Sequence, residues 1–162
     1  MAHVSRLTQQ LRSLLQSQRV ASLGTIADDG AAFVSMVPYA SEPNQGCLVI
    51  HVSDLAVHTR NLQARPRVSL LIMQPEVPGE PVHALPRVTL DGFATVLERQ
   101  SRGWEQCRTA YLERFPEAEL MTQLADFKFV GIEVKGARQV AGFGSARSID
   151  EEEVRLALAA PT

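Results

Sequence analysis

Four polar side chains near the middle of the sequence could together bind an anion. They are Ser53, His58, Thr59 and Arg60. They follow the short β-branched run at 49–52, and Ser53 or Asp54 is a typical N-cap for a helix that we expect to begin near Leu55. Free N–H groups and the positive end of the helix dipole suit a phosphate at such a start. The alternative reading is an ordinary helix cap followed by a solvated helical face.

The elements that would position these side chains form a strand–helix–strand unit. The predicted helix passes through Asn61 and Leu62, and it stops before Pro66 because proline disfavours helical geometry at the preceding residue. The apolar residues Val68, Leu70 and Leu71 then predict a second buried strand.

Three other places carry candidate site residues. His51 lies on the strand before the helix and either lines a pocket or sits at a strand end. Arg87 starts a strand on the face shared with Thr89 and Asp91, so it is either a site cation or the ion-pair partner of Asp91. Phe143 lies between two glycines, which permit close backbone approach, but it fits a core position at a tight bend equally well.

The remaining pattern predicts mostly strands with inserted helices. The leucines at 7, 11, 14 and 15 have the spacing of an amphipathic helix, and the Asp-Asp-Gly turn at 28–30 predicts a hairpin. We expect strands at 20–27, 31–39, 88–97, 127–134 and 138–143, with a turn at Gly136 between the last two. We also expect helices at 98–115, 117–124 and 150–158 and loops at 41–46 and 74–86, and the second loop is a candidate lid or dimer arm. From the residues alone the fold is α+β or a small β-barrel.

Composition excludes several functional classes. The 162 residues suffice for one domain with its own core, and a net charge of −2 with interspersed charges gives no footprint for nucleic acid or for a membrane. Cys47 and Cys107 are too few for a disulfide framework and fit small buried side chains, and the N-terminus lacks the apolar core of a signal peptide. We therefore expect a cytoplasmic protein. Histidines 3, 51, 58 and 83 show no metal-ligand spacing, so no metal site is expected.

Four segments resemble one family in the same order. They are ASLGTIADDGAAFVSMVPYA (21–40), SDLAVHTRNLQARPRVSLLI (53–72), PRVTLDGFATV (86–96) and ARQVAGFGSARSI (137–149). They are similar to the FMN-binding split-barrel superfamily, which includes pyridoxamine 5'-phosphate oxidase, and most similar to its haem-utilisation branch. The resemblance implies a mainly β split β-barrel with peripheral helices, spanning 1–162 as one domain. It also implies a homodimer with FMN at the subunit interface.

The same resemblance implies roles for particular residues. Ser35, Met36, Val37 and Pro38 would run beside the isoalloxazine ring, with His51 on a neighbouring strand. Val57 and His58 stand where the oxidase has an Arg-Lys pair that grips phosphate. Arg87 would raise the flavin potential by stabilising negative charge on the reduced ring, and Arg138 and Phe143 would approach the cofactor across the dimer. The oxidase's late Arg-x-His-x-Arg motif is not reproduced, which argues against oxidation of pyridoxamine phosphate.

Two functions of different classes remain open at this point. The first is an FMN-dependent oxidoreductase acting on a small molecule, and the second is a non-catalytic protein that holds flavin or haem. Members of the haem-utilisation branch are associated with haem binding or breakdown, and the longer ones carry a further C-terminal domain. This sequence ends at Thr162 without that domain, which argues against haem degradation.

Overall fold

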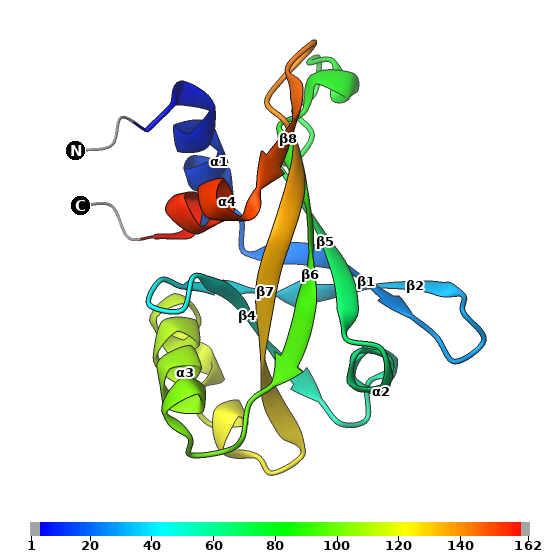
Figure 1. Cartoon of the computed structure of the whole chain (residues 1–162), viewed down its shortest axis with the longest axis vertical. Coiled ribbons are helices and arrows are strands. Elements are labelled where there is room, and N and C mark those ends of the chain that lie inside the picture. The colour runs from blue at the N-terminus through cyan, green and yellow to red at the C-terminus, as the bar shows by residue number, and fades with distance from the viewer. Residues whose placement is uncertain (1–3, 160–162) are drawn as a thin grey trace.

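A computed structural model describes residues 4–159 as a curled antiparallel sheet with helices at its periphery (Figure 1). The strand order is β2-β1-β5-β6-β7-β4-β3, and β8 pairs with β7. The strands are β1 Val20–Ile26, β2 Ala32–Pro38, β3 Ala40–Glu42, β4 Cys47–Ser53, β5 Arg67–Met73, β6 Arg87–Val96, β7 Phe127–Val140 and β8 Ala146–Asp150. The helices are α1 Arg6–Ser17, α2 Val57–Ala64, α3 Arg102–Arg114 and α4 Glu151–Leu158. The predicted mainly β split barrel with peripheral helices is confirmed.

The hairpin of β1 and β2 forms as predicted. Its register pairs Val20 with Pro38 and Ile26 with Ala32, and Gly30 in the turn has a φ of 84°, which glycine adopts without strain. β2 has β1 as its only partner in the sheet, so its outer edge is open. The hairpin projects beyond the curled sheet, and α2 lies beside it (Figure 1).

The strand–helix–strand unit is present, with one correction. α2 begins at Val57 rather than near Leu55, and its N-cap is Ala56, which makes no side-chain capping bond. Ser53 does not cap the helix; its hydroxyl accepts the Leu55 amide at 3.2 Å inside the preceding turn, which delays the helix by two residues. The helix ends before Pro66 as predicted. β4 and β5, which flank it, are separated in the sheet by β6 and β7.

The end of the chain differs from the prediction. β7 runs unbroken from Phe127 to Val140, whereas the sequence suggested a turn at Gly136. Glycine fits an extended strand when both neighbours pair with it, and Gly136 pairs with Asp91 of β6 and Asp150 of β8. The turn lies instead at 141–145, and the sequence analysis missed both β8 and the short β3.

Two other segments contain 3₁₀ turns. The predicted helix at 117–124 is two such turns, Pro116–Ala118 and Met121–Gln123. The proline-rich segment 74–86 is a loop, as predicted, with a 3₁₀ turn at Val82–Ala84.

A polar network joins the two terminal helices to the sheet. Arg147 binds the Glu153 carboxylate through both terminal nitrogens at 3.0 and 2.6 Å, and its Nε donates to Gln139 Oε1 at 2.9 Å. The Thr8 hydroxyl donates to Glu153 Oε1, and the Gln139 amide donates to the Leu7 carbonyl. The Arg147 guanidinium holds the pKa of Glu153 below its ordinary value.

Two apolar clusters form the core. The larger fills the curl of the sheet beneath α1 and α4, and the smaller lies between α3 and the outer side of β4 and β7. Cys47 and Cys107 are buried free thiols in the smaller cluster, as expected of small apolar residues. Within residues 4–159 we find no helix with the length and apolar character needed to span a bilayer.

Candidate functional site

Two of the predicted site residues meet where α2 lies against the edge strand. The Ser35 hydroxyl on β2 lies 2.9 Å from Nδ1 of His58 on α2. A second bond from α2 to the hairpin, Asn61 Nδ2 to Thr25 Oγ1 at 3.1 Å, and the buried Leu62 fix the helix against the sheet. We call the open edge of β2 (32–38) together with the start of α2 (55–60) the β2–α2 seam.

The His58 ring is oriented by this contact. Partial burial lowers the pKa of His58 below its ordinary value. Nδ1 is occupied by Ser35, whereas Nε2 has no partner within residues 4–159 and is open to solvent. The seam therefore offers one free imidazole nitrogen.

Large apolar side chains are exposed on β2 and at the start of α2. Val34 and Met36 flank Ser35 and point to the opposite face of β2, where they are 67% and 64% exposed. Leu55 and Val57 precede His58 and are 85% and 40% exposed. Large exposed apolar side chains on the edge strand and at the helix start make both elements candidate binding surfaces.

The other predicted residues of β2 contribute less through their side chains. Val37 is buried in the core, and Pro38 has no N–H group to donate. The open edge of β2 leaves the backbone N–H and C=O groups of alternate residues available to a ligand.

The start of α2 has free amides, but two of its predicted side chains are already engaged. The Thr59 hydroxyl is buried and donates to the Ser53 carbonyl at 2.6 Å, and the Ser53 hydroxyl accepts the Leu55 amide. In contrast, the N–H groups of Val57 and His58 have no partner within the described residues. A phosphate here would therefore meet backbone amides rather than hydroxyls.

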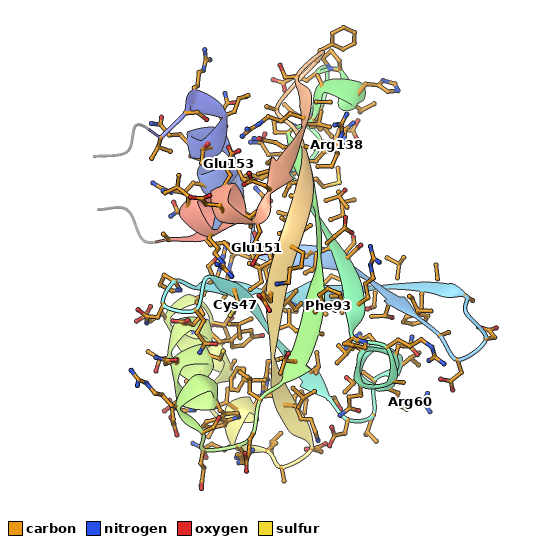
Figure 2. The ribbon with its side chains drawn as sticks, in the orientation of Figure 1. Cys47, Arg60, Phe93, Arg138, Glu151 and Glu153 are labelled. Carbon is orange, nitrogen blue, oxygen red and sulfur yellow. The ribbon has the colours of Figure 1, made fainter. Side chains whose placement is uncertain are left out.

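Arg60 is exposed and points away from α2 (Figure 2). It lines a hollow of about 350 Å³ together with Asp28 and Asp29. Arg65 binds Asp28 at 3.0 Å, so part of this negative charge is offset. The remaining carboxylate weakens the pull of Arg60 on an anion.

His51 lies apart from the seam. Its ring packs among Phe127, Phe129 and Tyr111 beneath α3, with ring centroids 5.1, 4.5 and 5.7 Å away. Burial, with the charge of Arg99 as a smaller cause, lowers the pKa of His51 to about 4, and its buried Nδ1 has no hydrogen-bond partner. The ring therefore packs against the smaller core cluster, apart from the seam.

Arg87, Arg138 and Phe143 lie at the opposite end of the sheet. Arg87 donates to the carbonyls of His83 and Leu85 at 3.2 and 2.8 Å, so it does not form the predicted ion pair with Asp91, whose carboxylate accepts from Ser69. Figure 2 places Arg138 far along the sheet from Arg60.

Arg138 donates to Ser148 at 3.3 Å. Phe143 is 88% exposed at the tip of the β7–β8 hairpin, which excludes the core position that the sequence left open.

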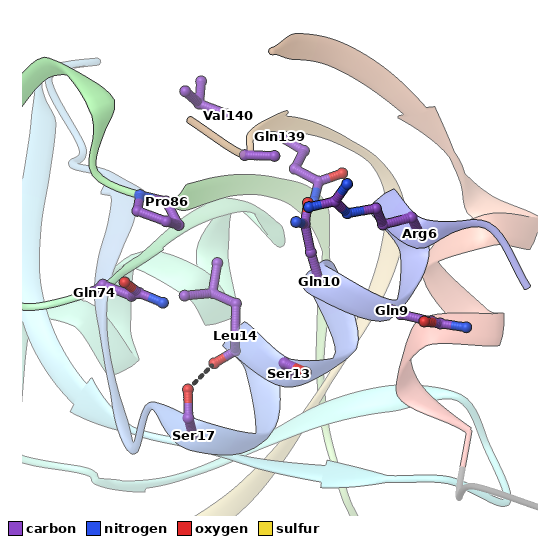
Figure 3. A pocket seen from close by; sticks show the side chains of 11 residues that line it. Arg6, Gln9, Gln10, Ser13, Leu14, Ser17, Gln74, Pro86, Gln139 and Val140 are labelled. Carbon is purple, nitrogen blue, oxygen red and sulfur yellow. Dashed lines mark hydrogen bonds between the residues drawn. The ribbon is translucent and has the colours of Figure 1, made fainter. Parts of the chain in front are cut away.

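A cavity of about 480 Å³ at the other end of the sheet involves none of the predicted residues. It lies between α1 and the ends of β5 to β7, and Arg6, Gln9, Gln10, Gln74 and Gln139 give it a polar lining (Figure 3). Residues 4–159 contain no group of three or more His, Cys, Asp or Glu side chains arranged to hold a metal ion.

Sequence reasoning named Ser35 and His58 separately and missed their contact. The two residues are 23 positions apart, and no local pattern connects a strand residue to a helix residue at that separation. The apolar residues Leu55 and Val57 at a predicted polar helix start were the available signal for a binding surface.

The comparisons with known proteins agree on one family. The model of the CREG β-barrel family matches residues 5–154. "Heme oxygenase HutZ" of Vibrio cholerae is 29% identical over 150 residues, which are 92% of this chain and 84% of that protein. "Non-canonical heme oxygenase HOZ, chloroplastic" of Arabidopsis thaliana is 32% identical over 140 residues, which are 85% of this chain and 41% of that protein.

A solved structure of a heme-binding protein from Mycobacterium smegmatis superposes with a TM-score of 0.84 and 30% identity. The match covers 94% of this chain and 61% of that one. The chain thus spans less than two thirds of this protein and of the Arabidopsis relative.

Proposed function

The chain belongs to the CREG β-barrel family, within the split barrels related to pyridoxamine 5'-phosphate oxidase, and from this premise we propose that it binds haem at the β2–α2 seam. The family resemblance of the sequence is confirmed. The choice of haem over FMN as the main ligand corrects the order of the sequence-based hypotheses, because the relatives from Vibrio and Arabidopsis are both named as heme oxygenases.

The composition of the seam is the observation that carries this proposal. Haem is a broad apolar ring with a metal at its centre and two carboxylates at one edge. The seam supplies exposed apolar side chains at 34, 36, 55 and 57, a free imidazole nitrogen on His58, and the exposed Arg60 as a cation for a carboxylate. When bound, haem supplies an iron atom whose reactivity depends on its axial ligand and on the polarity around it.

The proposed functional unit is a homodimer. A seam formed by one edge strand and one helix start leaves the second face of a flat ligand uncovered. A second copy that pairs near β2 would cover it and would bring Arg138 and Phe143, which lie far from the seam of their own chain, toward the seam of the partner. This arrangement accounts for an 88% exposed phenylalanine at a hairpin tip.

Titration of the purified protein with ferric haem, followed by its absorption spectrum, tests the proposal. We expect saturation at one haem per chain and a shifted Soret band, and the combined variant Met36→Ser, Val57→Ser should weaken binding. Haem that partitions without saturation, or with equal affinity in the variant and the wild type, would contradict binding at the seam.

FMN is the second candidate ligand, favoured by the unpaired amides of Val57 and His58 near Arg60. In that case the protein would be an FMN-dependent oxidoreductase. FMN should then bind much more tightly than riboflavin, which lacks the phosphate, and NAD(P)H should bleach the bound flavin. Equal affinity for the two flavins would exclude a phosphate site at the start of α2.

A further inference from the structure

The histidines differ in how accessible their ring nitrogens are to a metal ion. The structure describes His51, His58 and His83. His51 is enclosed by aromatic rings, and its buried Nδ1 faces no partner, so a large planar ligand cannot reach it without opening the smaller core cluster. His83 lies exposed in the loop between β5 and β6, at the end of the sheet away from the seam.

His58 combines the features that a haem ligand requires. Its Nδ1 is held 2.9 Å from the Ser35 hydroxyl, so the ring has a fixed orientation, and its Nε2 is open. Metal-binding histidines usually donate their other ring N–H to an oxygen acceptor, which selects the tautomer and fixes the ring.

We propose that Nε2 of His58 binds the haem iron and that Ser35 is the positioning residue whose hydroxyl accepts a hydrogen bond from Nδ1–H. This assignment rests on the proposed haem site and adds to it the atom that binds the iron. Iron on Nε2 requires the proton on Nδ1, and the Ser35 hydroxyl oxygen then accepts that hydrogen bond.

The neighbouring residues suit the ring that this bond would place there. Val57 precedes His58 on α2, Leu55 lies in the turn before the helix, and both are exposed. Arg60 follows two residues later and faces solvent, where a carboxylate at the edge of the ring would lie. None of these side chains forms a hydrogen bond or ion pair within residues 4–159 that haem would have to break.

The test uses the full chain loaded with ferric haem, and the readouts are the absorption spectrum and the iron–histidine vibration of the ferrous form. The wild type should give the signature of a histidine ligand. His58→Ala should lose it, and added imidazole should restore the wild-type spectrum by occupying the vacated space. The matched control His83→Ala should behave as wild type.

Ser35→Ala separates a positioning role from a merely structural one. The variant should keep the spectrum of a histidine ligand but shift the iron–histidine frequency. It should also weaken haem binding by about 10-fold, which is the low end of the loss seen when the hydrogen-bond acceptor of a metal-binding histidine is removed. Ser35→Thr, which retains a hydroxyl, should restore the frequency. Circular dichroism of each variant checks that the fold is intact.

The outcomes are distinct. Haem binding by the wild type with an unchanged spectrum in His58→Ala would overturn the ligand assignment and leave the proposed haem site standing. Failure of the wild type to bind haem would overturn both. As a variant that keeps a ligand atom in place, His58→Met should change the ligand signature without abolishing binding, and an unchanged signature there would likewise refute the assignment.

Discussion

Acid should destabilise the fold through His51. Because burial lowers its pKa from 6.5 to about 4, the unfolded chain takes up a proton before the folded protein does. The stability from the neutral ring is therefore fully present above pH 6.5 and is lost as the pH falls toward 4. With these two pKa values, the linkage relation gives a loss of about 2 kcal/mol between about pH 7.5 and about pH 5.

The assay is urea unfolding at these two pH values, followed by the fluorescence of Trp104. Other groups also titrate in this range, so the comparison is with His51→Leu, which fills a similar volume but takes up no proton. Its loss of stability between the two pH values should be smaller than that of the wild type by about 2 kcal/mol. His83→Gln, at an exposed position, should lose as much as the wild type. Equal losses in His51→Leu and the wild type would refute the reasoning.

Three further predictions concern the fold and its assembly. Gly92→Ala should lower the free energy of unfolding by about 1 to 3 kcal/mol, because a Cβ there would clash with the Glu133 carbonyl oxygen. Gly24→Ala should have a small effect, because the nearest atom to its Cβ would be 3.5 Å away, and similar urea midpoints for the two variants would contradict this reasoning. Glu153→Gln should cost about 1 to 2 kcal/mol by weakening its paired bonds from Arg147, and an unchanged midpoint would show that the network is dispensable. Equilibrium sedimentation at micromolar concentration should show a dimer, and a single species of 17.8 kDa would exclude it.

Local chemistry made much of the fold predictable. Pro66 disfavours helical geometry at the residue before it, and the Asp-Asp-Gly turn at 28–30 supplies a glycine that adopts positive φ without strain. Both features could therefore be predicted from neighbouring residues alone. The leucine spacing of α1 was readable for the same reason.

The errors arose where distant partners decide the local conformation. Gly136 suggested a turn, but pairing with β6 on one side and β8 on the other keeps β7 extended through it. Ser53 looked like a helix cap, yet its hydroxyl binds an amide within the preceding turn.

The candidate site was predictable as a list of residues and not as an arrangement. Ser35 came from the family resemblance and His58 from the helix start, but their hydrogen bond depends on how α2 docks on the hairpin. His51 is separated from the seam because strand alternation turns its ring to the side of the sheet that α3 covers.

A crystal structure of the protein loaded with ferric haem tests the central claim most directly. We predict that the ring lies at the β2–α2 seam, against Met36 and Val57, with a carboxylate directed toward Arg60 and a second copy covering the opposite face. Haem in the cavity beside α1, or anywhere else that leaves the seam open, would contradict the account.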